Sequence, residues 1–191
     1  GSGKSTLLNM IGGLDSLDSG EITIADRNIS GSDKKKLIDY RCEDVGFVFQ
    51  FYNLIPDLTV QENIEVVSDI SKNPLDIEEV MTALDIEKYR NRFPKELSGG
   101  QQQRAAIARA LIKNPKILLC DELTGALDSK SSRSVLKFIE KINEQFKTTI
   151  IIITHNEAIA DMADSVIRIK DGRIADYTEN SHKLSAEELA L

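Results

Sequence analysis

The chain has 191 residues, of which 41% are hydrophobic and 29% are charged. These are ordinary values for a globular protein with a sizeable core, so they exclude intrinsic disorder over most of the length. The formal net charge of −7 argues against nucleic acid as a partner, because nucleic-acid binders normally carry a basic face. Apolar runs such as Ile117–Cys120 are far shorter than the ~18 residues that span a bilayer, so we expect no direct membrane insertion.

Helices and strands are expected to alternate along the first half of the chain. Gly12-Gly13 should stop the first helix, and Gly31-Ser32 should form a turn before the next one. Periodicity and breakers predict a helix over Thr6–Ile11, a strand over Glu21–Ala25, a helix over Asp33–Arg41, a strand over Val45–Phe49, and a helical stretch from about Val60 to Arg92 that breaks at Asn73-Pro74.

The second half continues this alternation and adds a hairpin. The expected elements are a helix over Gln101–Lys113, a strand over Ile117–Cys120, a helix over Ser129–Gln145, a strand over Thr149–Thr154, a short helix over Asn156–Met162, and a hairpin of Ser165–Lys170 and Arg173–Tyr177 about Asp171-Gly172. Short apolar strands that alternate with helices predict an α/β fold with a parallel, doubly wound sheet. We expect an inserted helical subdomain at about residues 51–105 and a polar, frayed tail over 178–191.

The first six residues, Gly1-Ser2-Gly3-Lys4-Ser5-Thr6, match the end of a phosphate-loop pattern. In G-x-x-x-x-G-K-[ST], a glycine lets the backbone approach a phosphate, the lysine supplies a positive charge, and the hydroxyl can bind Mg²⁺. The first glycine of the pattern and the strand that should precede it are not in the sequence. We therefore expect the chain to be a piece of a longer domain; the alternative is a Gly/Ser linker that happens to contain a lysine.

Four polar side chains follow the apolar strands that the sequence predicts. Gln50 comes after Val45–Phe49, Asp121 and Glu122 follow Ile117–Cys120, and His155 follows the strand that ends at Thr154. Taken singly, each has an ordinary explanation as a surface residue, a solvated turn or a helix cap. Because ligands of open α/β sheets bind outside the carboxyl ends of the strands, we expect the four to converge on one crevice.

A second candidate phosphate-binding loop lies at Leu97–Arg104, where Ser98 and two glycines precede a long helix. Exposed N–H groups at a helix start, the helix dipole and a serine hydroxyl together favour an anion. The simpler alternative is an ordinary N-cap with a glycine turn. Since one nucleotide has little use for two phosphate loops of the same domain, a symmetric head-to-tail dimer is expected, in which each Ser98 loop closes over the partner's nucleotide.

Together these motifs resemble those of ATP-binding-cassette (ABC) ATPases, and the resemblance extends to about Tyr177. It rests on a truncated Walker A (Gly1–Thr6), a Q-loop glutamine (Gln50), a signature motif (Leu97–Arg104), a Walker B strand with its glutamate (Ile117–Glu122), a D-loop (Ala126-Leu127-Asp128) and a switch histidine (His155). ATPases of the macrolide-exporter, lipoprotein-release and antimicrobial-peptide-resistance type are similar at Gly46–Leu54, Glu62-Asn63, Leu97–Arg104 and Thr124–Asp128.

The resemblance implies a P-loop NTPase (RecA-like) core over residues 1–177, with ATP and Mg²⁺ as cofactors, and an ATPase activity. It implies catalytic roles for Glu122, which would polarise the attacking water, and for Gln50 and His155, which would sense the γ-phosphate. Ser5, Gln50 and Asp121 would hold Mg²⁺. The nucleotide-binding residues implied in the same way are Gly1, Ser2, Gly3, Lys4, Ser5, Thr6, Ser98, Gly99, Gly100, Gln101 and Asp128.

The resemblance also implies partners and a location. A homodimer of ATPase subunits would drive an integral-membrane permease at the cytoplasmic face of the plasma membrane, and the work would be export or release of a lipoprotein, peptide or antibiotic. The apolar segment Phe51–Pro56, directly after Gln50, is where a permease would dock. The alternative for that segment is core packing of the helical subdomain.

Two other classes of cassette protein are weighed against a transporter subunit. DNA-repair cassettes carry long coiled coils or zinc modules between their motifs, and the short insert here has neither heptads nor cysteine pairs; ribosomal types usually join two cassettes by a basic linker. A regulatory cassette that signals through a permease-like partner during cell division stays open as an alternative, because its motifs would be the same.

Two departures from the family pattern affect these expectations. Leu123 stands where the family usually has a proline after the catalytic glutamate. Proline would fix φ near −65°, so we expect Leu123 to loosen the turn without removing a reacting group. The incomplete phosphate loop predicts that the polypeptide as written binds nucleotide weakly.

Overall fold

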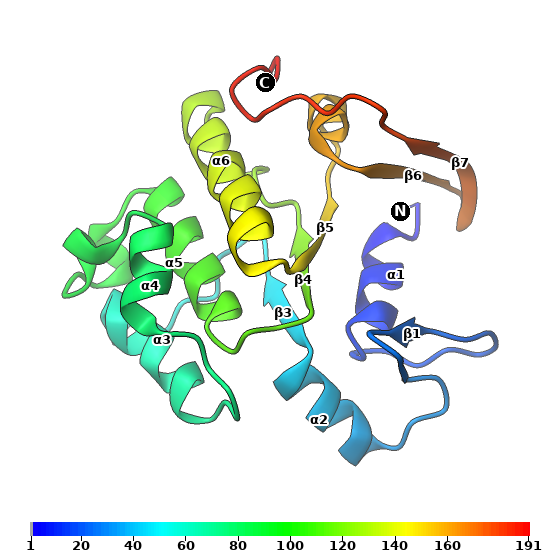
Figure 1. Ribbon diagram of the computed structural model, residues 1–191, viewed down its shortest axis with the longest axis horizontal. Coiled ribbons are helices and arrows are strands. Elements are labelled where there is room, and N and C mark those ends of the chain that lie inside the picture. The colour runs from blue at the N-terminus through cyan, green and yellow to red at the C-terminus, as the bar shows by residue number, and fades with distance from the viewer. Residues whose placement is uncertain (1) are drawn as a thin grey trace.

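In the computed structural model, which describes residues 2–191, a parallel sheet forms the centre of the molecule (Figure 1). Its strands are β3 (Val45–Val48), β4 (Ile117–Asp121) and β5 (Thr149–Ile153), in the order β3-β4-β5. Val48 lies beside Cys120, and Asp121 lies beside Ile153, so all three strands end at the same edge. The predicted parallel sheet is confirmed.

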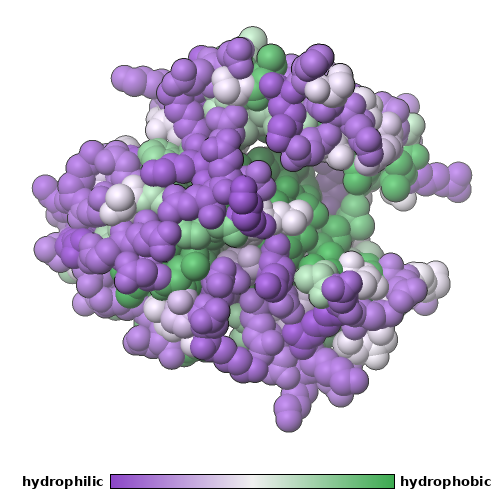
Figure 2. All heavy atoms as spheres, viewed as in Figure 1, coloured by the Kyte–Doolittle hydropathy of each residue, from purple (hydrophilic) through white to green (hydrophobic). Residues whose placement is uncertain are grey.

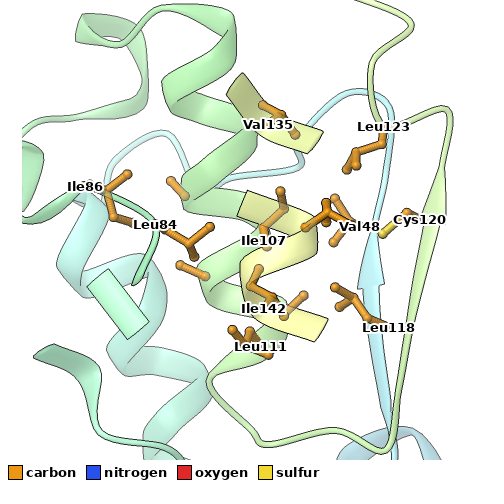
Figure 3. Packing of buried hydrophobic residues seen from close by; sticks show 14 of the residues in the cluster. Val48, Leu84, Ile86, Ile107, Leu111, Leu118, Cys120, Leu123, Val135 and Ile142 are labelled. Carbon is orange, nitrogen blue, oxygen red and sulfur yellow. The ribbon is translucent and has the colours of Figure 1, made fainter. Parts of the chain in front are cut away.

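Each face of this sheet is covered by helices because the side chains of β4 alternate between two cores. Leu118 and Cys120 belong to the larger core, which packs on α5 (Gly99–Leu111) and α6 (Ser129–Phe146) (Figure 3). Ile117 and Leu119 face the smaller core, with residues from α1 (Lys4–Ile11) and α2 (Lys34–Glu43). Strand residues that are buried on both faces read as continuous apolar runs, which is why the sequence pattern identified them.

The predicted helical subdomain is an array of short helices beside α5 (Figure 1). Its elements are α3 (Val60–Asp69), α4 (Ile77–Ala83) and the 3₁₀ turns η1 (Glu87–Tyr89) and η2 (Pro94–Glu96). The helical stretch breaks between α3 and α4, as Asn73-Pro74 predicted; its α-helical part ends at Ala83, and the 3₁₀ turn η1 continues it to Tyr89. The expected subdomain boundary near residue 105 falls within the continuous helix α5, whose C-terminal half packs on the sheet.

The segment between α1 and α2 forms a short hairpin, where the sequence predicted a single strand. Strands β1 (Thr23–Ile24) and β2 (Arg27–Asn28) have two residues each and pair antiparallel. Ala25 and Asp26 connect them with φ values of +48° and +66°. A two-residue turn with both φ values positive matches the twist of a hairpin, so the strand expected over Glu21–Ala25 ends one residue early, at this turn.

After β5 the chain forms the 3₁₀ segment η3 (Glu157–Met162) and the antiparallel pair β6 (Ser165–Lys170) and β7 (Arg173–Glu179). This pair is the predicted hairpin, with Asp171-Gly172 at its turn.

The tail beyond Thr178 is not frayed, contrary to expectation. Ala186 and Leu189 are buried in the larger core, and Arg133 of α6 donates hydrogen bonds to the backbone carbonyls of Glu187 and Leu189 at 2.9 and 3.0 Å. Two small apolar contacts and one arginine therefore hold a segment whose composition is mostly polar.

The surface is largely hydrophilic, with apolar atoms gathered in a hollow near the middle of the face shown in Figure 2, where Figure 1 places β5. Within the described residues β5 pairs only with β4, and Ile150, Ile151 and Ile152 are partly exposed. None of the helices in residues 2–191 combines the length and the apolar character that crossing a bilayer requires.

Candidate functional site

Three of the predicted site residues gather at the carboxyl edge of the sheet. Gln50 follows β3, Glu122 follows β4 and His155 follows β5, each within two residues of its strand end. His155 Nε2 lies 3.0 Å from Glu122 Oε1. A methyl group built on Gly125 would meet Gln50 Nε2 at 3.2 Å and Glu122 Oε2 at 3.3 Å, so these two side chains border the same point. The predicted convergence therefore holds for Gln50, Glu122 and His155.

The backbone of Glu122 is unusual, with a φ of +49° that places it in the left-handed region. Two hydrogen bonds hold it there: its N–H donates to Ile153 O, and Gly125 N–H donates to Glu122 O, both at 2.9 Å. The Leu123 side chain is only 2% exposed and packs in the larger core (Figure 3). Leu123 thus packs in the core beside this turn, and the expectation that the turn is looser than with a proline stays a prediction.

A pocket of about 350 Å³ opens beside Glu122 and His155. The Glu122 side chain is 30% exposed and the His155 side chain 72% exposed, so both reach solvent. Thr124, Thr154 and Asn156 add polar side chains to the wall. A carboxylate beside an imidazole, open to a space that admits water, is a suitable arrangement for activating a water molecule as a nucleophile.

The phosphate-loop residues lie at the start of α1, which packs against β4. Gly3 has a φ of +91°, a conformation that favours glycine, and its carbonyl accepts a hydrogen bond from Leu7 N–H at 3.0 Å. Lys4 Nζ donates to Ser2 Oγ at 2.8 Å. Ser5 and Thr6, in the first turn, are exposed; the prediction for Gly1 lies outside the described residues.

The Ser98 loop is a capped helix start. Ser98 Oγ accepts a hydrogen bond from Gln101 N–H at 3.4 Å, and Ser98 N–H donates to Gln101 Oε1 at 2.8 Å. This is a capping box, so the simpler alternative considered for Ser98 is present in this structure. A methyl group on Gly99 would lie 2.9 Å from the Tyr52 hydroxyl and 3.2 Å from Leu127, which shows how closely the Q-loop and the D-loop approach the helix.

Asp128 of the D-loop has a similar role at the start of α6. Its carboxylate accepts hydrogen bonds from Ser131 N–H at 2.9 Å and from Ser131 Oγ at 2.8 Å. These bonds stabilise the ionised form, so they lower the pKa of Asp128. The nucleotide contact implied for Asp128 is not tested by these bonds.

The predicted residues thus fall into two groups within one chain. The phosphate loop, Asp121 and the Glu122–His155 pair belong to the sheet edge and α1, whereas Ser98 begins α5. Figure 1 shows α1 and α5 on opposite sides of the sheet. The structure places Gln50, Glu122 and His155 together at the sheet edge, the phosphate loop at the start of α1, and Ser98 at the start of α5.

Comparison with known proteins identifies the family. A family model described as "ABC transporter" matches residues 1–125. The bacitracin export ATP-binding protein BceA of Halalkalibacterium halodurans is 42% identical over 184 residues, which cover 94% of this chain and 72% of that protein. The chain belongs to the ABC transporter family. An ABC transporter ATP-binding protein of Mycoplasma pneumoniae, the MG467 homologue, is 45% identical over 177 residues, covering 91% of this chain and 52% of the relative.

Solved structures agree with this assignment. The dimeric post-hydrolysis structure of the ATP-binding cassette MJ0796, bound to ADP and Pi, superposes with a TM-score of 0.80 at 38% identity, covering 93% of this chain and 81% of that one. The fold is therefore that of P-loop NTPase cassettes. The chain spans about half the length of the first curated relatives it matches, at 52% and 57%.

Two residues of this ABC domain hold the loop after β3 and were not singled out from the sequence as part of the site. Asn63 of α3 is fully buried; its Nδ2 contacts the carbonyls of Ile55, Leu58 and Thr59 at 2.9 to 3.1 Å, and its Oδ1 accepts from Ile55 N–H at 2.8 Å. The available signal for this position was the pair Glu62-Asn63, which carried part of the family resemblance without a role being assigned to Asn63.

Arg109 of α5 is the second such residue. It donates to the backbone carbonyls of Asn53 and Tyr52 at 2.6 and 3.1 Å. Because its partners are carbonyls, which every residue has, no residue type in the loop indicated the contact.

Proposed function

We propose that this chain is the ATP-hydrolysing subunit of an exporter and that it drives a partner permease through ATP-dependent dimerisation. The observation that carries the proposal is the cluster of Gln50, Glu122 and His155 at the carboxyl edge of a parallel sheet, where ligands of such sheets bind. Relatives named for bacitracin and macrolide export support a peptide or an antibiotic as the exported substrate; a lipoprotein rests on the resemblance of the motifs alone.

In the proposed reaction, water attacks the γ-phosphate, and the bond between that phosphate and ADP breaks. Glu122 accepts a hydrogen bond from the attacking water and draws its proton away as the new bond forms. His155, whose Nε2 is 3.0 Å from Glu122 Oε1, orients the carboxylate and can also donate to the γ-phosphate. Gln50 completes the set, because its amide borders the same point as the Glu122 carboxylate.

Mg²⁺ and the nucleotide phosphates belong at the start of α1. Ser5 supplies a hydroxyl oxygen, and Gln50 and Asp121 supply amide and carboxylate oxygens, which are the hard ligands that Mg²⁺ prefers. When bound, this ion would offset the negative charge of the nucleotide phosphates. Lys4 and the backbone N–H groups of Gly3 to Thr6 would bind the phosphates, as is usual for a helix start of this kind.

The second half of each site comes from another copy of the chain. Ser98, Gly99 and Gly100 start α5 on the opposite side of the sheet from α1, so a head-to-tail partner can bring them to the nucleotide. The dimeric, ADP-bound cassette with 38% identity supports this arrangement. ATP would hold the two copies together through both loops, and hydrolysis would release them.

The permease is proposed to dock on Phe51–Pro56 and so to hold the domain at the cytoplasmic face of the plasma membrane. Phe51 is 76% exposed and Ile55 is 40% exposed, although they lie in a loop whose backbone Asn63 fixes. Exposed apolar side chains on an ordered backbone suit a binding surface, since little further ordering is needed on association. This exposure favours docking over the alternative of subdomain core packing for Phe51.

The docking proposal is tested with the intact protein and the membrane protein encoded beside its gene. Phe51→Asp should reduce co-purification with that membrane protein at least tenfold and remove its effect on ATP hydrolysis, while basal hydrolysis stays within about twofold. Ile174→Asp is the matched control, because Ile174 is 68% exposed but lies on β7. Equal co-purification of both variants and the unmodified protein would contradict docking at this segment.

A further inference from the structure

We propose that Arg109 is a positioning residue that joins the Gln50 loop to the signature helix α5, so that the two move as one unit. The inference rests on the proposed function, because it assigns a task to the loop that carries Gln50 and to the helix that begins at Ser98. Its basis is the pair of hydrogen bonds from Arg109 to the carbonyls of Asn53 and Tyr52, at 2.6 and 3.1 Å.

The loop that Arg109 holds is in a strained conformation. Tyr52 has a φ of +59° and Asn53 a φ of +50°, and consecutive non-glycine residues rarely occupy the left-handed region. Such a backbone persists only where its surroundings hold it. Arg109 contacts the carbonyls of these two residues, so its guanidinium is the side chain best placed to hold this conformation.

The charged Arg109 side chain is partly buried, and its hydrogen bonds within the described residues go to these two carbonyls. Burial lowers the pKa of the Arg109 guanidinium, and among the described residues no carboxylate offsets this effect. A half-buried arginine that bonds only to backbone carbonyls gains hydrogen bonds without an ion pair. Its removal would leave two carbonyls without these donors and the loop free to relax.

A second contact joins the same loop to the other end of α5. The Tyr52 side chain lies against the first turn of the helix, where a methyl group on Gly99 would be 2.9 Å from the Tyr52 hydroxyl. Gly99 and Arg109 are ten residues apart, or about 15 Å along a helix axis. Because the two contacts are that far apart along α5, they fix both the orientation of the helix relative to the loop and the distance between helix and loop.

The consequence is a mechanical connection between the two groups of site residues. Ser98 and Gly99 begin α5, and Gln50 lies two residues before Tyr52, next to the Glu122 carboxylate. When the signature loop of one copy engages the partner's nucleotide, the motion of α5 would pass through Arg109 to the Gln50 loop of its own site. Each site would then respond to the occupancy of the other.

The first test compares Arg109→Gln with Arg133→Gln in the intact protein. Arg133 is a matched control, because it also donates to two backbone carbonyls, at 2.9 and 3.0 Å, but in the C-terminal tail. Arg109→Gln should lower the kcat for ATP hydrolysis at least tenfold while the Kd for ATP changes less than threefold; Arg133→Gln should change kcat less than twofold. Equal kcat values for Arg109→Gln and the unmodified protein would overturn the proposal.

A strain-relief variant separates positioning from simple destabilisation. Asn53→Gly should restore at least a third of the lost kcat in the Arg109→Gln background, because glycine adopts a positive φ without help. A merely structural role for Arg109 predicts no such rescue, and its absence would count against the proposal. If Arg109→Gln does not fold, Arg109→Lys, which retains a single charged donor, should show an intermediate kcat.

Hydrogen exchange provides a readout that does not depend on turnover. A non-hydrolysable ATP analogue is added in increasing amounts, and the protection of the amides of residues 50–54 and 98–102 is followed. In the unmodified protein both segments should gain protection at the same analogue concentration, whereas in Arg109→Gln they should gain it at different concentrations. If the phosphate loop of the unmodified protein gains protection but residues 50–54 and 98–102 do not respond together, the inference is overturned and the proposed ATP binding is left intact. No response anywhere in the unmodified protein would overturn both.

Discussion

The sheet edge and the signature loop differ in what their polar groups do in this structure. At the sheet edge, Glu122 and His155 contact each other, reach solvent and border a pocket of about 350 Å³. At the signature loop, Ser98 and Gln101 satisfy each other in a capping box. One region presents reactive groups to a cavity, and the other is a completed helix start.

This difference explains how the two regions can share one reaction. Groups that activate water must be held in place while their polar atoms stay free, which the strand ends and the buried Leu123 achieve for Glu122. A loop that only closes over a bound anion can be stable without it, since its N–H groups and dipole face outward at a capped helix start. In the proposed function, the sheet edge therefore carries out the chemistry, and the Ser98 loop responds to a second copy.

The largest effect is expected at the sheet edge, from Glu122→Gln in the intact protein. The amide keeps the size of the side chain but cannot accept the proton of the attacking water, so the ATP turnover rate should fall about 10²–10⁴-fold. ATP affinity, measured by calorimetric titration, should change only a few-fold. Near-normal turnover would show that the reacting carboxylate lies elsewhere and would remove the distinction between the two regions.

A smaller effect is expected where the core supports the site, from Leu123→Ala. Loss of this buried side chain should lower the free energy of unfolding by about 2–4 kcal/mol, measured by urea denaturation. Because Leu123 anchors the turn that holds Glu122, kcat should also fall several-fold in the folded protein.

Leu84→Ala is the control for that variant, since Leu84 is fully buried in the same core but lies at the end of α4. It should show a similar loss of stability with kcat nearly unchanged. If Leu123→Ala and Leu84→Ala have the same kcat, Leu123 contributes to stability but not to the position of Glu122.

The sequence predicts most of the sheet edge for a physical reason. Buried parallel strands appear as short apolar runs such as Ile117–Cys120, and their carboxyl ends must lie at one edge, so the residues that follow them converge. That reasoning located Gln50, Glu122 and His155 without any coordinates. The helix boundaries were predicted less accurately. For example, α5 starts two residues before the expected Gln101.

Contacts to the backbone could not be predicted in the same way. Arg109 binds carbonyls 56 and 57 residues away in the chain, and a carbonyl carries no information about residue type. The tail was expected to be frayed because it is mostly polar, yet Ala186 and Leu189 are buried in the larger core and Arg133 of α6 binds its backbone. Burial of so few apolar atoms depends on the tertiary surface that receives them.

Sizing chromatography of Glu122→Gln with ATP tests whether the signature loop acts on a second copy of the chain. The single variant should form an ATP-dependent dimer, and adding Ser98→Arg should abolish it while ATP binding to the monomer stays within a few-fold. Asp76→Arg is the control, because it removes the N-cap of α4, with a comparable loss of about 0.5–2 kcal/mol, away from the loop. An ATP-dependent dimer that persists with Ser98→Arg would contradict the claim.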